Sequence, residues 1–277
     1  MREYTEPTPI DLQAFSTGRV LKESWEISTK YFGALVMPLF LLMLPGFIIV
    51  MIVPGKPGES LNNLISAILC PIAVMGLNRA VLRLKTEGVI PSFSQTFTAG
   101  NEYWWRGFKI NFVTGIYGIG IGIAIIVMIL PGALLASKEA LIGGILLTAG
   151  AIGCIWILIW FCTRACLAIP AMADNRTSAS KAFDAGWDLA KKNADSTRRL
   201  VLAIAGISLG LLITFVGAVA LAAFTGICSA EIAIGLLAIP ALFLYIFCLA
   251  YFYVAMNLAY LALKPAPAEE PMQVPAA

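Results

Sequence analysis

The sequence predicts an all-α polytopic membrane protein with six transmembrane helices, on the basis of composition, hydropathy and charge distribution. Of its 277 residues, 60% are hydrophobic and 13% are charged, and the mean hydropathy is +0.87. A soluble domain carries about a quarter charged residues. A helix needs roughly 20 apolar residues to cross the hydrocarbon core. Six runs approach or exceed that length: Gly33–Val53, Leu61–Asn78, Ile110–Ala136, Leu141–Cys162, Leu200–Phe224 and Ile232–Leu263.

Basic residues gather on one side of these predicted spans. All 19 lysines and arginines except Lys56 and Lys138 lie before the first span or after the second, fourth and sixth spans. Since cytoplasmic loops carry the excess of Lys and Arg, we predict that both termini are cytoplasmic. The polar, acidic segment Met1–Thr17 does not resemble a secretory signal, so the first span is expected to act as the insertion signal and to be retained.

Similar segments occur at three places, and self-similarity of this kind marks a repeat architecture. The segments after the second, fourth and sixth spans share an alanine and their apolar positions, and Arg79 and Arg164 coincide in the first two. A tryptophan-bearing segment precedes the first and fifth spans, with a weaker copy, Tyr103–Arg106, before the third. The five clear segments are Asn78–Leu84, Thr163–Ile169, Asn257–Leu263, Ser24–Lys30 and Gly186–Lys192.

Two spans per unit return the chain to its starting side. We therefore predict three parallel units, each a surface helix followed by a transmembrane hairpin, about an axis near the membrane normal. The units cover about residues 8–84, 91–169 and 177–263 and form a single membrane domain, residues 1–263. Residues 264–277 are rich in Pro and Ala and are predicted to be a disordered cytoplasmic tail.

The surface segments carry signals for the start of amphipathic helices. Thr8-Pro9, Ser92 and Thr177 are predicted helix starts or N-caps. Two interpretations of these helices stay open: an interfacial helix with Trp at headgroup depth, which we favour, and a cytosolic linker that packs on the bundle. In the third helix, one predicted face holds Ala182, Phe183, Trp187 and Ala190, and Lys181, Asp184, Asp188 and Lys191 point away from it.

The residues that usually carry catalysis are missing from the places where they would be needed. The chain has no histidine, and no acidic residue lies at the middle of a predicted span. Histidine is the commonest general base and metal ligand, and ion-coupled carriers usually keep an ionisable group within the membrane. We therefore predict no catalytic, cofactor-binding or metal-binding residues, a protein that is not an enzyme, and no coupled transport.

Polar and small residues inside the spans are expected to serve helix packing. Asn62, Ser66, Thr148 and Thr214 are among the polar residues predicted to form interhelical hydrogen bonds. The pairs Gly118/Gly122 and Gly206/Gly210 are predicted to let helices approach closely, within the monomer or between protomers.

Arg79 and Arg164 occupy matching positions where a span leaves the hydrocarbon on the basic side. Either arginine could fork onto a lipid phosphate. The alternative is a snorkelling anchor or an ion pair with Glu87 or Asp174. The full set of candidate contacts for lipid headgroups or a partner is Trp25, Arg79, Arg83, Trp104, Trp105, Arg164, Trp187 and Lys191.

Several of these segments resemble a known group of proteins. They are the Trp-bearing segment before the first span, Asn78-Arg79-Ala80, and Ala182-Phe183, Trp187 and Lys191–Asn193 after a Pro170-containing exit. Over about residues 15–263 the chain resembles bacterial six-span membrane proteins of poorly defined function, related to the membrane domain of glycerophosphoryl diester phosphodiesterases. The resemblance implies a bacterial plasma-membrane protein. It implies no catalysis, because in the fused members the enzyme is a separate soluble domain.

The expected function is therefore a non-enzymatic scaffold or accessory subunit that binds anionic lipid headgroups or a partner protein at its cytoplasmic face. An alternative is an uncoupled transporter or channel for a lipidic or small amphiphilic solute, which a continuous polar path through the spans would support. The expected partners are membrane lipids, other membrane proteins in a larger complex, or further copies of the chain. No nucleic-acid partner is expected.

Overall fold

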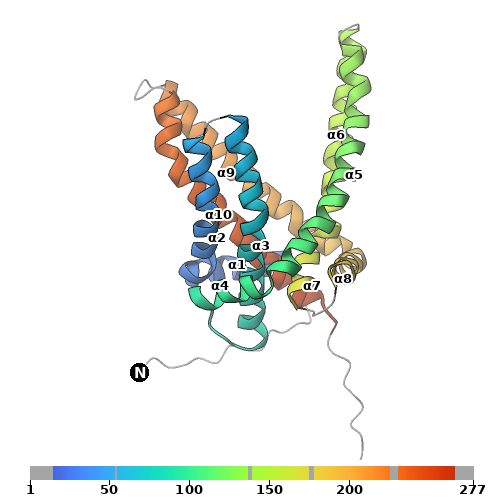
Figure 1. Ribbon diagram of the computed structural model, residues 1–277. Helices are drawn as coiled ribbons and strands as arrows, with labels where there is room; N and C mark the ends of the chain where they lie inside the picture. The colour runs from blue at the N-terminus through green and yellow to red at the C-terminus, as the bar shows by residue number, and fades with distance from the viewer. Residues whose placement is uncertain (1–14, 54, 137–138, 175–177, 225–229, 266–277) are drawn as a thin grey trace, which may run out of the picture.

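The computed structural model describes residues 15–53, 55–136, 139–174, 178–224 and 230–265. These residues form ten helices and no strand (Figure 1). The helices are α1 (Thr17–Lys30), α2 (Phe32–Ile52), α3 (Lys56–Thr86), α4 (Phe93–Glu102), α5 (Trp104–Ala136), α6 (Ala140–Ala165), α7 (Ala168–Asp174), α8 (Ala179–Lys192), α9 (Ala194–Phe224) and α10 (Ala230–Leu263).

Among the described residues, six segments are long and apolar enough to cross a membrane, which indicates a multi-pass membrane protein. They belong to three hairpins, α2–α3, α5–α6 and α9–α10, whose members pack against each other. These segments are Phe32–Val50, Lys56–Thr86, Trp104–Leu135, Leu141–Asp174, Ala194–Ala218 and Leu242–Leu263. The number and order of the predicted spans are thus confirmed.

Several helices extend further than the sequence predicts. The predicted span Leu61–Asn78 lies within α3, a helix of 31 residues. At 1.5 Å per residue such a helix is about 46 Å long, whereas the hydrocarbon core is only about 30 Å thick. A span predicted from hydropathy stops at the last apolar side chain, whereas the helix itself continues through Arg83 and Lys85 in its last turn. Polar helix ends therefore project beyond the apolar section.

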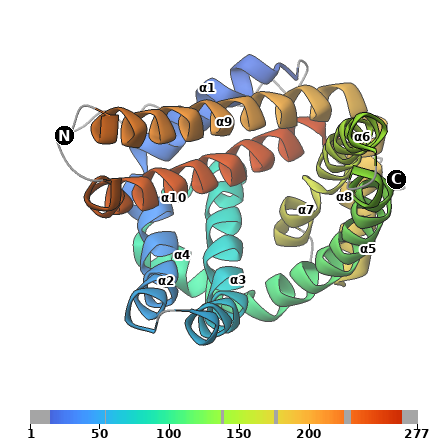
Figure 2. The ribbon, with the colours of Figure 1, turned by 90° about the horizontal axis from the view of Figure 1, so that it is seen from above.

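The short helices α1, α4, α7 and α8 gather at one end of the bundle, where α10 also ends (Figure 1). The described lysines and arginines lie in these helices, in the turns of α3, α5, α6 and α9 nearest to them, or directly after α10, except Lys56 at the opposite end of α3. We call this end the basic end. Seen from above, α7 lies near the centre of the bundle (Figure 2), where it contacts α3, α5, α8 and α10.

Each surface helix packs on the second span of a hairpin. Helix α4 packs on α3, α8 packs on α6 and α7, and α1 packs on α10, the last helix of the chain. The contact between α1 and α10 closes a circle between the two ends of the described chain. The hydrophobic core of the bundle includes Leu35, Leu39, Met75, Leu167 and Met256, none of which is more than 1% exposed.

The three hairpins contribute unequally to this core. In α3 and in the last span, half of the residues in the most apolar stretch are buried inside the protein. In α5 and in the α6 span, only 6% and 11% of the corresponding residues are buried. Figures 1 and 2 show the α5–α6 hairpin standing apart from the other spans at the end away from the surface helices. Most of its apolar surface is therefore left for lipid or for a partner.

Close helix packing uses glycines other than the predicted ones. A Cβ atom built on Gly76 of α3 would lie 2.3 Å from the carbonyl oxygen of Thr96, and one on Gly100 of α4 would lie 2.1 Å from that of Ile72. The backbones of α3 and α4 can touch only because both positions are glycine. By contrast, no atom of the described residues lies within 4 Å of a Cβ at Gly118, Gly122, Gly206 or Gly210. The prediction that these two pairs bring helices together within the monomer is wrong, and their use between protomers stays a prediction.

Two of the three predicted helix starts can be compared with the structure. Ser92 caps α4 as predicted, because its Oγ accepts a hydrogen bond from the backbone N–H of Gln95 at 3.3 Å. The N-cap of α8 is Ser178, which accepts from the N–H of Lys181, and not the predicted Thr177. Thr8-Pro9 and Thr177 lie outside the described residues, and the first described helix begins at Thr17.

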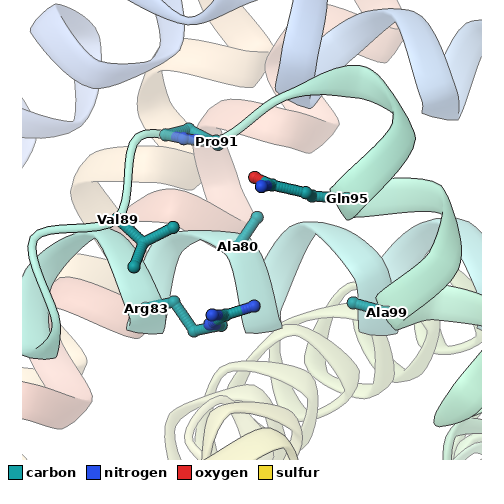
Figure 3. Close-up of a pocket in the computed structure, with 6 residues that line it drawn as sticks. All are labelled: Ala80, Arg83, Val89, Pro91, Gln95 and Ala99. Carbon is teal, nitrogen blue, oxygen red and sulfur yellow. The ribbon is translucent and has the colours of Figure 1, made fainter.

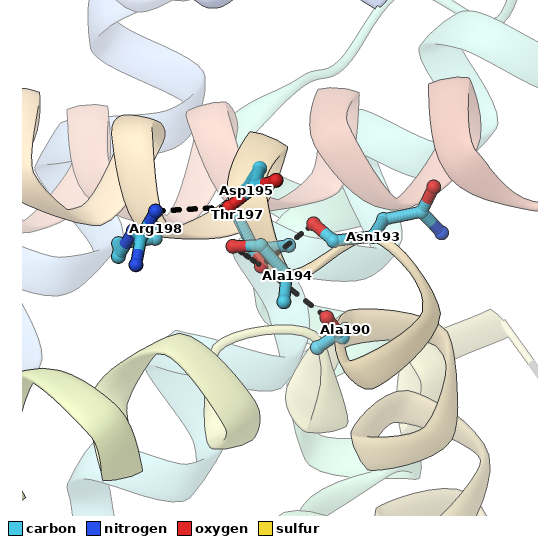
Figure 4. A network of polar contacts seen from close by, with 6 residues as sticks. All are labelled: Ala190, Asn193, Ala194, Asp195, Thr197 and Arg198. Atoms are coloured by element: carbon cyan, nitrogen blue, oxygen red, sulfur yellow. Dashed lines mark hydrogen bonds and ion pairs between the residues drawn. The ribbon is translucent and has the colours of Figure 1, made fainter.

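A buried hydroxyl fastens the turn between α8 and α9 (Figure 4). The side chain of Thr197 is fully buried, and its Oγ lies 3.0 Å from the carbonyl oxygen of Asn193, 3.2 Å from that of Ala194 and 3.4 Å from that of Ala190. One hydroxyl donates one hydrogen, so these carbonyls share it. The hydroxyl thereby connects the last turn of α8 to the first turn of α9.

We expect Thr197→Val to destabilise the protein by about 1 kcal/mol, because a nearly isosteric side chain removes the buried hydrogen bond of the hydroxyl. Denaturant titration in mild detergent, followed by circular dichroism, would measure this change. Thr148→Val is the matched control, since the exposed Thr148 hydroxyl also donates to a carbonyl of its own helix, that of Gly144. Equal effects of the two substitutions would contradict the prediction.

Candidate functional site

Trp25 lies on the outer side of α1, where it is exposed although it also contacts α10. Its ring meets those of Phe247 and Tyr251 edge-on, with centroid distances of 5.3 and 6.4 Å. The hydroxyl of Tyr251 donates a hydrogen bond to the carbonyl oxygen of Leu21 at 3.2 Å. Helix α1 is therefore held against α10, and Trp25 remains exposed beside this contact.

The two tryptophans at the start of α5 have different environments. The indole N–H of Trp104 donates to the carbonyl oxygen of Ile68 in α3 at 2.8 Å, which makes Trp104 a structural contact between the helices. Trp105 is 53% exposed and stacks on Phe108. The ammonium of Lys109 lies 5.3 Å from the centroid of the Trp105 ring. Trp105 and Lys109 thus form an exposed aromatic and cationic pair at the basic end.

Helix α8 buries the face that the sequence predicts. Ala182, Phe183 and Ala190 are buried, Trp187 is half-buried, and the four predicted outer residues are exposed, Lys191 among them. Trp187 lies 5.5 Å from Trp160 and 5.6 Å from Phe183 between ring centroids. The helix therefore packs on the spans, as in the second interpretation of the surface helices. Its position at a membrane interface stays a prediction.

Arg79 makes neither of the ion pairs that the sequence suggested for it. Its Nη1 donates to the carbonyl oxygen of Ala173 at 3.1 Å, and its guanidinium lies 5.3 Å from the ring centroid of Tyr103. Asp174 instead accepts from the Tyr260 hydroxyl at 2.9 Å and from the Lys264 ammonium at 2.5 Å. Arg79 is thus a structural link from α3 to α7, and α10 holds the adjacent carboxylate.

Arg83 takes the partner that was suggested for Arg79. Its Nε donates to the Glu87 carboxylate at 2.9 Å, and both side chains are substantially exposed. An exposed pair of this kind contributes about 0.2–1 kcal/mol. Arg83 also borders a small open pocket between α3 and α4 (Figure 3), which is lined by Ala80, Arg83, Val89, Pro91, Gln95 and Ala99.

A buried asparagine pair joins α3 to α10. The Nδ2 of Asn257 donates to the Oδ1 of Asn78 at 2.7 Å, and neither residue has any accessible surface. Each amide also donates to the carbonyl four residues earlier in its own helix, as does the buried hydroxyl of Thr163. The sequence contains a signal that could have indicated this pair, because Asn78 and Asn257 occupy the same position in two of the three similar segments.

Three hydroxyl groups that the sequence suggested for interhelical hydrogen bonds bond within their own helices instead. Ser66 bonds to Asn62 of the same helix, and the hydroxyls of Thr148 and Thr214 donate to carbonyls of their own helices. Such bonds satisfy a hydroxyl in an apolar environment without a partner helix. For these residues the prediction of interhelical hydrogen bonding is wrong.

Arg164 differs from Arg79 in its surroundings. It lies in the last turn of α6, and its Nη1 atom is buried and has no hydrogen-bond partner among the described residues. The residue as a whole keeps part of its surface accessible. A buried donor without an acceptor is costly, and more so when it carries charge. The structure therefore binds Arg79 into the framework, whereas it gives Nη1 of Arg164 no acceptor among the described residues.

Comparisons with family models, curated proteins and solved structures find no match to this chain. The resemblance to bacterial six-span membrane proteins consequently stays a prediction.

Proposed function

We propose that this chain is a non-enzymatic protein of the bacterial plasma membrane that acts as a scaffold or accessory subunit. In this proposal the basic end faces the cytoplasm and contacts anionic lipid headgroups. The observation that carries the proposal is the exposed Trp105 ring with the Lys109 ammonium 5.3 Å from its centroid. Tryptophan favours the headgroup depth of a bilayer, and a lysine beside it can pair with lipid phosphates.

The exposed residues of the other surface helices support the same surface. Trp25 on α1 and Lys191 on α8 are both exposed, and the surface helices lie at the end that holds the described arginines and lysines other than Lys56. Each basic residue near an anionic leaflet contributes about 1 kcal/mol of attraction. Several such residues distributed over three helices would orient the bundle and enrich anionic lipid around it.

We further propose that the chain is built from three parallel units, each a surface helix and a hairpin. The circle of contacts between α1 and α10, α4 and α3, and α8 and α6 supports this architecture, because each surface helix packs on the second span of another unit. The matching backbone bonds of Asn78, Thr163 and Asn257 support it as well. Three units would give the protein three similar surfaces for lipid or for a partner protein.

We do not favour the alternative of an uncoupled transporter. A transporter for an amphiphilic solute needs polar groups that are free to contact the solute inside the bundle. Ser66, Thr148 and Thr214 use their hydroxyls within their own helices. These residues therefore supply no continuous polar path.

Neutralising Lys109 is expected to lower the preference for anionic lipid about fivefold at its site, which corresponds to about 1 kcal/mol per basic residue. The measurement is quenching of tryptophan fluorescence in nanodiscs by brominated phosphatidylglycerol, compared with brominated phosphatidylcholine, for the wild type and Lys109→Gln. Lys56→Gln is the control, because Lys56 lies at the opposite end of α3. Equal quenching by the two lipids in the wild type would contradict the proposed function.

A further inference from the structure

We infer that Arg164 is a specific binding site for the phosphate group of one membrane phospholipid, whose acyl chain lies along α6. The inference deepens the proposed function, since it names one site and one ligand class within the lipid-contacting surface. It begins from the buried Nη1 of Arg164, which has no hydrogen-bond partner among the described residues. A guanidinium stays charged at every relevant pH and offers five donors and no acceptor, so the missing partner must be an acceptor.

Four carboxylates of the described chain already have other partners. Asp174 binds Lys264 and Tyr260, Asp195 binds Arg198, and Glu87 binds Arg83. The carboxylate of Glu23 is likewise paired with Lys85. None of the ion pairs between described residues includes Arg164, so no described carboxylate neutralises its charge. A phosphate from outside the chain would match the planar fork of the guanidinium with two parallel hydrogen bonds.

The position of Arg164 favours a lipid phosphate over other anions. Arg164 is in the last turn of α6, a helix of 26 residues that ends at the basic end. Phosphate groups of a bilayer lie at this depth, directly outside the hydrocarbon core. The residue is partly exposed, so a headgroup phosphate can bind the accessible part of the guanidinium from outside the bundle and neutralise the charge that the buried Nη1 shares.

The surface of α6 provides a path for the acyl chain. Trp160, Trp156 and Ile152 precede Arg164 at intervals of four residues and are 48%, 66% and 64% exposed. Residues spaced by four form one ridge along a helix. This ridge leads from Arg164 toward the middle of the span, and it belongs to the hairpin that buries least of its surface within the protein.

Arg79 is a natural internal control for this site. It follows Asn78 in the way that Arg164 follows Thr163, but its Nη1 is already bound to the carbonyl oxygen of Ala173. Substitution of Arg79 should reduce stability without releasing a lipid. Substitution of Arg164 should release the lipid.

The test is native mass spectrometry of the full chain purified in mild detergent, for the wild type, Arg164→Gln, Arg164→Lys and Arg79→Gln. The wild type and Arg79→Gln are expected to retain one phospholipid. We expect Arg164→Gln to bind added short-chain phosphatidylglycerol roughly tenfold more weakly, and Arg164→Lys to fall in between because lysine keeps the charge and loses the fork. Arg164→Lys preserves the test if the glutamine variant does not fold.

Three results would overturn the inference. The first is equal lipid retention by the wild type and both Arg164 variants. The second is binding of inorganic phosphate that depends on Arg164, without binding of the lipid. The third is a gain of lipid binding at Arg164 only after Glu269→Gln and Glu270→Gln are introduced, since an acidic residue of the chain itself would then be the partner.

The failure of this site is distinguishable from a failure of the proposed function. The nanodisc experiment on Lys109 measures a general preference for anionic lipid at the exposed surface. The mass spectrometry experiment measures one retained molecule, so either result can be negative while the other is positive.

Discussion

Replacement of Gly76 by alanine is expected to destabilise the protein by about 2 kcal/mol, because a methyl group would be forced into a closely packed helix contact. The new Cβ would lie 2.3 Å from the Thr96 carbonyl oxygen and also close to the backbone of Gly100. Both are backbone atoms, so no side-chain rotation can relieve the contact. Helix α4 would have to move away from α3, with loss of the packing around buried Thr96.

Gly118→Ala is the matched control for this substitution. In the part of the chain that the structure describes, nothing lies within 4 Å of a Cβ at Gly118, and alanine is favoured over glycine in a helix by about 1 kcal/mol. We expect this variant to be as stable as the wild type or slightly more stable in thermal unfolding in detergent. A loss of stability at Gly118 equal to that at Gly76 would show that the α3–α4 contact is not the cause. A loss of stability at Gly118 together with a loss of oligomers would favour a contact between protomers.

The second large effect is expected at the buried asparagine pair. Asn78→Ala removes the acceptor of the Asn257 amide, and Asn257→Ala removes the donor, so each single change leaves a buried polar group unpaired. We expect each to cost about 1–3 kcal/mol. The double variant is expected to be more stable than the sum of the single effects predicts, because neither amide is then left without its partner.

A double-mutant cycle measured by denaturant titration tests this coupling directly. We expect a coupling energy of about 0.5–1.7 kcal/mol, the range of hydrogen bonds between membrane helices. Asn62→Ala combined with Ser66→Ala is a suitable control cycle, since these two side chains bond within one helix and are only partly buried. Strict additivity of Asn78→Ala and Asn257→Ala would contradict the role of the pair in joining α3 to α10.

The spans could be predicted from sequence because the transfer of apolar side chains from water into hydrocarbon dominates their energetics. A run of about 20 apolar residues is favourable in hydrocarbon whatever its neighbours are, and the backbone must satisfy its hydrogen bonds within that run. The buried face of α8 was predictable for a similar reason, since Ala182, Phe183 and Ala190 share one side of any helix. Such local periodicities require no knowledge of the partner helix.

The candidate site could be predicted only in part. The local sequences around Arg79 and Arg164 are similar, and both arginines were expected to have the same role. In the structure Arg79 meets a carbonyl of α7 and the ring of Tyr103, whereas Arg164 buries a donor that lacks an acceptor among the described residues. The difference arises from the neighbours of each helix end, and these neighbours are distant in the chain.

The sequence alone determined the helical class, the number of spans and the gathering of charge, because hydrophobic and electrostatic patterns act on residues that are close in the chain. The tertiary structure alone decided which glycines touch, which asparagines pair, and that the Nη1 of Arg164 has no acceptor among the described residues. Those outcomes depend on contacts between residues such as Gly76 and Thr96 or Asn78 and Asn257. A contact of a few ångströms between distant segments is set by the packing of whole helices, which no local pattern encodes.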